Sequence, residues 1–130
     1  MRSFVIGFAL VLSGTGLAQA QDAAAGEKVF SQCRACHQIG PTAKNAVGPA
    51  QNGLLGRKAG TYPGYAYSNA NKNSGLTWDE ATFREYIRAP QAKIPGTKMV
   101  YPGLKNEQQI TDLIAFLKQY DESGNKTVAN

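Results

Sequence analysis

Histidine and cysteine are scarce in this 130-residue chain, which contains one histidine and two cysteines. All three lie in the pentapeptide Cys33-Arg34-Ala35-Cys36-His37. A closed structural zinc site normally takes four Cys or His ligands. Three such residues therefore exclude a closed zinc site, and a single imidazole excludes a metal centre ligated by two histidines.

Long hydrophobic runs and blocks of one charge are also missing. The longest apolar run, Phe4 to Leu12, is much shorter than the ~20 residues of a membrane-spanning helix. The chain has a formal net charge of +5, but its lysines are dispersed. This excludes a polybasic patch for nucleic acid or lipid. A diffuse positive face suits attraction to an acidic protein partner, and ordinary solubilising charge is the alternative.

Residues 1–20 have the layout of a secretory signal peptide. Arg2 is followed by the apolar run and then by Ala18-Gln19-Ala20, an A-x-A cleavage motif. We expect cleavage after Ala20 and a periplasmic protein. The alternative, a membrane anchor, is disfavoured by the short run. Residues 21–130 are then long enough for one domain.

The remaining sequence predicts an all-α fold with three main helices and long loops. The first helix is expected over 23–34 with Asp22 as its N-cap. The second is expected to begin at a capping box formed by Thr77 and Glu80 and to end at Arg88, before Pro90. Asn106 should cap the third.

The third predicted helix has the clearest amphipathic pattern, with apolar residues at Ile110, Leu113, Ile114, Leu117 and Tyr120. Residues 38–75 and 94–103 are rich in Gly, Pro, Asn and Ser and predict loops. We expect residues 122–130 to form a frayed tail. The predicted helices contain too few aliphatic residues to form the core of a stable domain of about 110 residues. This shortage indicates a bound prosthetic group.

The pentapeptide has the C-x-x-C-H form of covalent c-type haem attachment. Two thiols three positions apart can add to the two vinyl groups of a haem, and the next residue, His37, is then the proximal iron ligand. A redox-active dithiol without haem is the alternative. That reading expects the motif at a helix start in a βαβ pattern, which this sequence lacks.

A second axial ligand can be found by elimination. Besides Met1, in the leader, the only methionine is Met99, in a polar loop after Thr97 and Lys98. A lone methionine is often a core filler, but this setting favours a ligand. Together, His and Met ligation raises the reduction potential of a haem.

An ordered set of motifs covering about residues 22–120 resembles class I cytochrome c, and with the leader it is most similar to the bacterial c2 type. The motifs are CRACH, VGPAQNGLLGRKAG, GYAYSNANKNSG, LTWDEATFREYIRAP, IPGTKM and LIAFLK. The resemblance implies the class I cytochrome c fold around one haem c, covalently bound through Cys33 and Cys36. It also implies a soluble one-electron carrier of respiration or photosynthesis, and not an enzyme.

The resemblance further implies roles for residues around the haem. Pro49 matches the proline whose carbonyl accepts the Nδ1 hydrogen of the haem histidine. Gly26 and Phe30 match positions where the first helix crosses the last, near Leu113 and Phe116. The resemblance also implies two sets of polar residues. One set hydrogen-bonds the haem propionates: Arg57, Tyr67 and Trp78. The other surrounds the methionine sulfur: Asn71, Tyr86 and Thr97.

The sequence departs from the family pattern in three places. Ala50-Gln51-Asn52 puts a polar Gln where an aliphatic residue packs on the haem. Tyr101 takes the place of a phenylalanine at the haem edge. Gln91 and Ala92 replace a lysine pair of the docking face. The remaining candidate docking lysines are Lys28, Lys44, Lys93, Lys98 and Lys105.

The expected partners are acidic faces of redox proteins, met transiently by a monomer. A cytochrome bc complex, a photosynthetic reaction centre, a terminal oxidase and a periplasmic dehydrogenase would all fit. The competing function is a five-coordinate haem that binds peroxide or a gas. That function needs Met99 to be unbound and a distal acid or base, for which the chain has no spare histidine.

Overall fold

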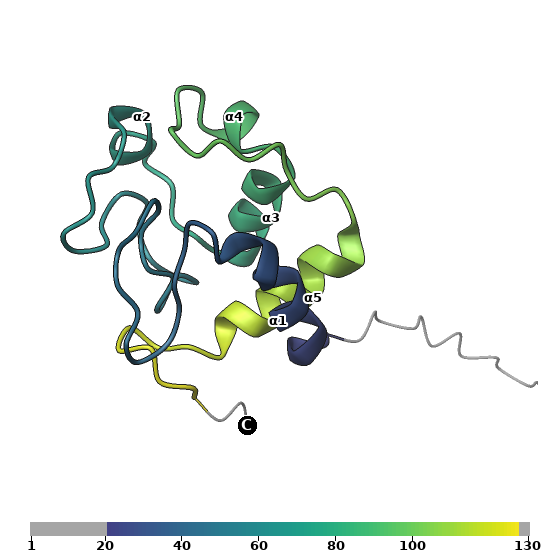
Figure 1. The fold of residues 1–130 in the computed structure, drawn as a ribbon. Helices are drawn as coiled ribbons and strands as arrows, with labels where there is room; N and C mark the ends of the chain where they lie inside the picture. The colour runs from purple at the N-terminus through teal and green to yellow at the C-terminus, as the bar shows by residue number, and fades with distance from the viewer. Residues whose placement is uncertain (1–20, 128–130) are drawn as a thin grey trace, which may run out of the picture.

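A computed structural model describes residues 21–127 (Figure 1). The predicted signal peptide, its cleavage after Ala20 and residues 128–130 lie outside these described residues. The described part is helical and contains no strand, only two isolated antiparallel bridges. Its elements are α1 (Ala23–Phe30), the 3-10 helix η1 (Ser31–Cys33), α2 (Asn69–Lys72), α3 (Glu80–Arg88), α4 (Pro90–Lys93) and α5 (Glu107–Lys118). The predicted all-α class is confirmed.

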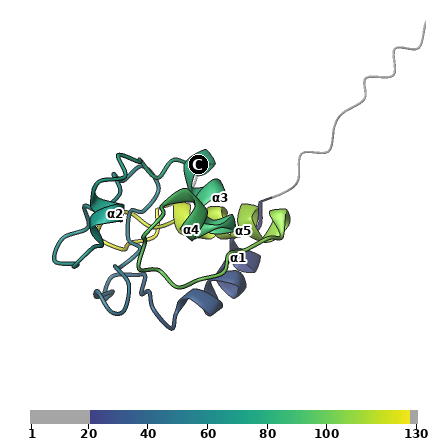
Figure 2. The ribbon, with the colours of Figure 1, turned by 90° about the horizontal axis from the view of Figure 1, so that it is seen from above.

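Helices α1 and α5 cross closely, and Gly26 makes the crossing possible. A Cβ atom on Gly26 would lie 1.9 Å from the backbone oxygen of Asp112. Beside this contact, the rings of Phe30 and Phe116 pack with their centroids 5.2 Å apart. Figures 1 and 2 both show the two helices side by side. The predicted crossing is therefore confirmed.

Helix α1 begins as expected but ends earlier. The Asp22 carboxylate accepts a hydrogen bond from the Ala25 N–H at 3.0 Å, as an N-cap does. The α-helix ends at Phe30, not at residue 34, and continues as the tighter η1. The N–H groups of Cys36 and His37 then both donate to the Cys33 carbonyl. This tightening turns the chain just where the C-x-x-C-H motif lies.

Helix α3 starts later than the predicted capping box implies. Its N-cap is Asp79, which accepts from the Thr82 N–H at 2.7 Å, and the prediction of Thr77 as the cap is wrong. Thr77 instead forms a bridge with Lys58, and the Trp78 N–H donates to the Arg57 carbonyl. These bonds hold residues 77–78 extended, so the helix cannot begin there.

The ends of α3 and α5 follow the prediction more closely. Helix α3 ends at Arg88, and Pro90 then occupies the first turn of the short α4, where its missing N–H costs nothing. Asn106 caps α5 by accepting from the Gln109 N–H. One face of α5 is buried, including Ile110 and Leu113.

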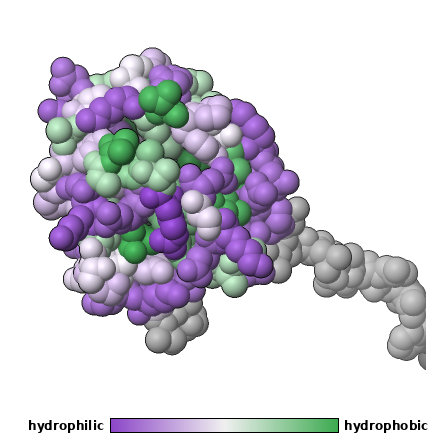
Figure 3. Space-filling view, in the orientation of Figure 1, coloured by the Kyte–Doolittle hydropathy of each residue, from purple (hydrophilic) through white to green (hydrophobic). Residues whose placement is uncertain are grey.

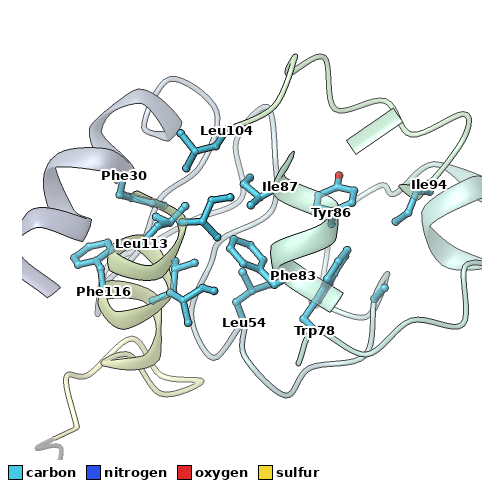
Figure 4. Packing of buried hydrophobic residues seen from close by; sticks show 14 residues of the cluster. Phe30, Leu54, Trp78, Phe83, Tyr86, Ile87, Ile94, Leu104, Leu113 and Phe116 are labelled. Atoms are coloured by element: carbon cyan, nitrogen blue, oxygen red, sulfur yellow. The ribbon is translucent and has the colours of Figure 1, made fainter. Parts of the chain in front are cut away.

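The hydrophobic core lies at one side of the molecule, between α1, α3 and α5. Figure 4 shows Phe30, Leu113 and Phe116 gathered between α1 and α5, with Phe83 pointing toward them from α3 and Tyr86 on the other side of α3, near Trp78. Between η1 and α3 the chain forms only one short helix, α2. Figure 2 shows this segment (blue to teal) on the side away from the α1–α5 crossing. The core is thus one-sided, and loops form the other side.

The expected fraying of the tail does not hold for residues 122–127. The Gly124 N–H donates to the Asp121 carbonyl, and the Thr127 N–H donates to the Gln119 carbonyl at 2.6 Å. A Cβ atom on Gly124, whose φ is +79°, would lie 2.0 Å from the Gly40 oxygen. Glycine therefore lets this turn pack on the loop that follows the C-x-x-C-H motif.

Candidate functional site

A cavity of about 350 Å³ lies between the core and the loops. Its walls include apolar side chains of the core, among them Leu54, Phe83 and Leu113. Figure 3 shows hydrophobic residues in gaps between the hydrophilic residues of the face drawn. A cavity of this size is in the usual range of ligand sites.

The cavity brings together all eleven residues proposed from the sequence to hold the cofactor or its metal. They are Cys33, Cys36, His37, Pro49, Arg57, Tyr67, Asn71, Trp78, Tyr86, Thr97 and Met99. They come from η1 and the turn after it, the long loop with its short helix α2, α3 and the segment after α4. Residues far apart in the sequence therefore line a single site.

The two cysteines are free thiols and partly buried. Burial, reinforced by the nearby Cys36, raises the pKa of Cys33 from 9.0 to about 11, against a smaller lowering by Arg34. Redox-active C-x-x-C motifs instead carry a thiol with a lowered pKa. The raised pKa of Cys33 therefore disfavours the dithiol alternative.

His37 is held on two sides. Its Nδ1 lies 2.7 Å from the Pro49 carbonyl oxygen, and a Cβ atom on Gly48 would lie 2.3 Å from its Cε1 atom. Burial lowers the pKa of His37, and the charge of Arg57 lowers it further, although the Pro49 hydrogen bond acts in the opposite direction. A neutral imidazole that donates through Nδ1 keeps a free lone pair on Nε2, as a metal-ligating histidine does.

Met99 is held from its sulfur and from its backbone. The Tyr86 hydroxyl donates to Met99 Sδ at 3.2 Å, and the Met99 N–H donates to Thr97 Oγ1 at 3.3 Å. The Gln91 amide donates to the carbonyls of Thr97 and Met99, at 3.2 and 3.0 Å. The next residue, Val100, is 96% exposed. Side-chain hydrogen bonds thus help to fix this loop over the cavity, together with the backbone bond from the Thr97 N–H to the Ile94 carbonyl and the packing of Met99 against the core.

Two buried polar atoms at the cavity have no hydrogen-bond partner in the described residues: Arg57 Nε and Asn71 Oδ1. Arg57 also donates through Nη1 to the Asn52 carbonyl at 2.9 Å, and its guanidinium stacks on the Tyr62 ring. Burial lowers the pKa of Arg57, against smaller raising effects of nearby tyrosines and of Glu122. A partly unsatisfied buried guanidinium suits an anionic group of a bound ligand, since leaving it unpaired is costly.

Tyr67 and Trp78 lie at the same part of the cavity. The Tyr67 hydroxyl accepts a hydrogen bond from the Tyr62 N–H at 3.1 Å. The Trp78 ring is buried and packs against Tyr86, with centroids 4.8 Å apart. Both side chains therefore have a structural contact in addition to their place in the cavity wall.

The five candidate docking lysines differ in their surroundings. Lys98 lines the cavity, lies over the Tyr65 ring and donates to the Ala66 carbonyl. Lys93 pairs with Glu85, and Lys105 donates to the Arg88 carbonyl. Lys28 and Lys44 are exposed. Only Lys98 belongs to the rim of the cavity.

Two residues at the site were not assigned a role from the sequence. Gln51 was expected only to disturb haem packing, yet its side chain lies beside His37 and Pro49. Gln91 was considered only as a lost docking charge, yet it holds the Met99 loop. Tyr101 donates to Gln32 Oε1 at 3.0 Å. No local sequence pattern predicts these long-range contacts.

The described residues contain no cluster of three or more His, Cys, Asp and Glu side chains that could hold a metal ion. Nor does any helix in residues 21–127 have the length and apolarity needed to cross a membrane.

Comparison with known proteins gives one consistent result. A family model described as cytochrome c matches residues 23–121. Cytochrome c2 of Blastochloris viridis is 59% identical over 126 residues, covering 97% of this chain and 99% of the relative. Cytochrome c-550 of Bradyrhizobium diazoefficiens is 64% identical over 102 residues, covering 78% of this chain and 75% of the relative.

Solved structures agree with the sequence relatives. Cytochrome cH from Methylobacterium extorquens has a TM-score of 0.72 and 50% identity, covering 75% of this chain and 98% of that one. Cytochrome c2 from Rhodospirillum centenum has a TM-score of 0.72 and 41% identity, covering 77% of this chain and 98% of that one.

Proposed function

Because this chain belongs to the cytochrome c family, we propose that it carries single electrons with His37 and Met99 as the axial ligands of its haem. The family is one of electron-transfer proteins with one haem c, attached here through Cys33 and Cys36. The residues fit this group. Two free thiols, an apolar cavity and the partly unsatisfied Arg57 match its vinyl groups, its ring and its carboxylates.

The observation that carries the proposal is that both candidate ligands line one cavity, each with its partner in place. Pro49 accepts from His37 Nδ1, and Tyr86 donates to Met99 Sδ. Haem supplies an iron that alternates between the ferric and ferrous states. His37 and Met99 would hold the iron, and their partners Pro49 and Tyr86 would keep both side chains in place as it gains and loses an electron.

The surrounding residues control charge and water. Arg57, Tyr67 and Trp78 would pair with the haem carboxylates, which would be costly to bury alone. Asn71, Tyr86 and Thr97 would set the polarity around the Met99 sulfur. Leu54 and Phe83 exclude water from the cavity wall, and a dry site with this ligation favours the reduced state.

For partners, we propose transient encounters with acidic faces of redox proteins in the periplasm, after removal of residues 1–20. A cytochrome bc complex, a reaction centre, an oxidase or a dehydrogenase has suitable chemistry. The diffuse positive charge supports this, and Lys98 at the cavity rim is the best-placed docking residue. Reduction by the partner should slow as ionic strength rises.

The experiment is an absorption spectrum of the exported protein, ferric and then ferrous, beside the variant M99A. Wild type should give a low-spin c-type spectrum with the weak far-red band of a ferric iron–methionine bond, and M99A should keep its haem but lose that band. As a control, V100A alters the exposed neighbour and should leave the band intact. A wild-type protein that contains haem but lacks the far-red band would favour the five-coordinate, peroxide-binding alternative. A wild-type protein without haem would favour the alternative of a redox-active dithiol.

A further inference from the structure

Gln51 stands where the family pattern has an aliphatic residue, and its side chain is buried with 9% exposure. Its amide nitrogen lies 2.7 Å from His37 Nδ1 and 3.0 Å from the Pro49 carbonyl oxygen. The same oxygen lies 2.7 Å from His37 Nδ1. Three polar groups therefore meet at the Nδ1 side of the imidazole, where His37 Nδ1 and the Gln51 amide nitrogen both approach the Pro49 carbonyl oxygen.

Coordination decides how the hydrogens are distributed among these groups. A neutral histidine that binds iron through Nε2 carries its hydrogen on Nδ1. Nδ1 then donates to Pro49 and cannot accept from Gln51. The Gln51 amide therefore also donates to the Pro49 carbonyl, which has two lone pairs. Two donors share one oxygen, and each bond is weaker than it would be alone.

The strength of the Nδ1 hydrogen bond matters to the iron. A stronger acceptor at Nδ1–H makes the imidazole more basic and a better electron donor. Such a ligand stabilises the ferric state and lowers the potential. Gln51 weakens this bond and also places partly positive amide hydrogens beside the ring. Both effects oppose the positive charge that oxidation adds.

We propose that Gln51 is a positioning residue that raises the reduction potential of the haem by sharing the Pro49 carbonyl with His37. The proposal rests on the proposed ligation of iron by His37. The backbone supports this role, because the Gln51 N–H donates to the Gln38 carbonyl at 2.9 Å and the Gly48 N–H donates to the Cys36 carbonyl at 2.8 Å. The loop that carries Gln51 is thus tied to the segment that carries the histidine.

The deciding variant is Q51N, which stays polar but has a side chain one carbon shorter and too short to reach Pro49. At a fixed ambient potential near the midpoint, its ratio of ferrous to ferric protein should fall about three- to tenfold. At 59 mV per tenfold for one electron, the midpoint falls by about 30 to 60 mV. An unchanged or higher midpoint in Q51N overturns the proposal, and a higher one would mean that the amide oxygen faces Nδ1.

A second readout reports the hydrogen bond itself. In the ferrous protein labelled with 15N, the His37 Nδ1–H proton should show a cross-peak to the Gln51 side-chain amide. In Q51N and in Q51L this proton should move downfield as its bond to Pro49 strengthens. A wild-type protein without that cross-peak contradicts the geometry on which the proposal depends.

The matched control is Q38L. Gln38 lies in the same loop, but its side chain accepts from the Lys44 N–H and makes no hydrogen bond to His37. Its midpoint and its Nδ1–H shift should stay at the wild-type values. Failure of the proposed function is recognised separately, because wild type would then lack the far-red band. With the band present and the Q51N potential unchanged, only the role of Gln51 is refuted.

Discussion

The two walls of the cavity are built differently. On the histidine wall, the ring of His37 packs directly on backbone, where Gly48 has no Cβ and the Pro49 carbonyl lies against Nδ1, and the Gln51 side chain lies beside it. On the methionine wall, Met99 sits in a loop between Thr97 and the exposed Val100, held by side-chain hydrogen bonds. Each such bond contributes about 1 kcal/mol. Substitutions on the histidine wall should therefore act by steric displacement of the His37 ring or its loop. Substitutions on the methionine wall should act by making local opening of the Met99 loop easier.

The largest effect is expected on the histidine wall from G48A. The new Cβ atom would lie 2.3 Å from His37 Cε1, so either the ring or the loop must move. We expect the free energy of unfolding to fall by about 3 kcal/mol, as for an overpacked core. Guanidinium unfolding followed by Trp78 fluorescence measures this fall.

The control for G48A is G75A, where a Cβ atom would meet nothing and only the φ of +70° is strained. It should cost about 1 kcal/mol. Equal losses in the two variants would show that contact with His37 is not the cause.

An intermediate effect is expected on the methionine wall from Q91L, which removes both hydrogen bonds from the amide to the loop. Opening of the loop should become easier by about 1.4 kcal/mol. If Met99 is the proposed ligand, cyanide would have to displace it to bind ferric iron, and should then bind about tenfold more tightly. Spectroscopic titration measures the affinity.

Q38L sharpens this prediction, because it removes one side-chain hydrogen bond on the histidine wall. Cyanide affinity should stay at the wild-type value. A similar gain in Q38L would mean that the two walls do not open independently.

The smallest effect concerns the pH dependence of stability. Burial raises the pKa of Tyr86 above 10.0, against a smaller lowering by the Thr97 hydrogen bond. The unfolded chain therefore loses this proton at a lower pH than the folded one, so stability falls as pH rises above about 10. In Y86F this fall should be shallower. Denaturant unfolding at several alkaline pH values tests it, and identical slopes would contradict it.

The sequence predicted the histidine wall better than the methionine wall. A five-residue motif identifies Cys33 and His37, because covalent attachment requires that spacing. Met99 is proposed as a ligand only by elimination, and the contacts of Gln91 were not predicted, since its partners lie in a loop without periodicity. Helix ends were predicted where a cap was local, as at Asp22 and Asn106. The start of α3 was missed because the bridge of Thr77 with Lys58 is a contact made only in the folded chain.

Gln51 shows the same limit. Its departure from the family pattern was visible in the sequence and indicated a disturbed apolar contact. The structure instead places its amide against the Pro49 carbonyl. Composition identifies an unusual residue, but only the geometry identifies the atom it bonds.

The most direct test of the central claim uses the fact that the chain has only one methionine besides Met1. In ferrous protein labelled with 13C at the methionine methyl groups, a methyl bound over the haem plane is shifted far upfield by the ring current. The account predicts one strongly upfield methyl, assigned to Met99 by its loss in M99A. A Met99 methyl at its ordinary position in folded, haem-containing protein would contradict ligation by His37 and Met99.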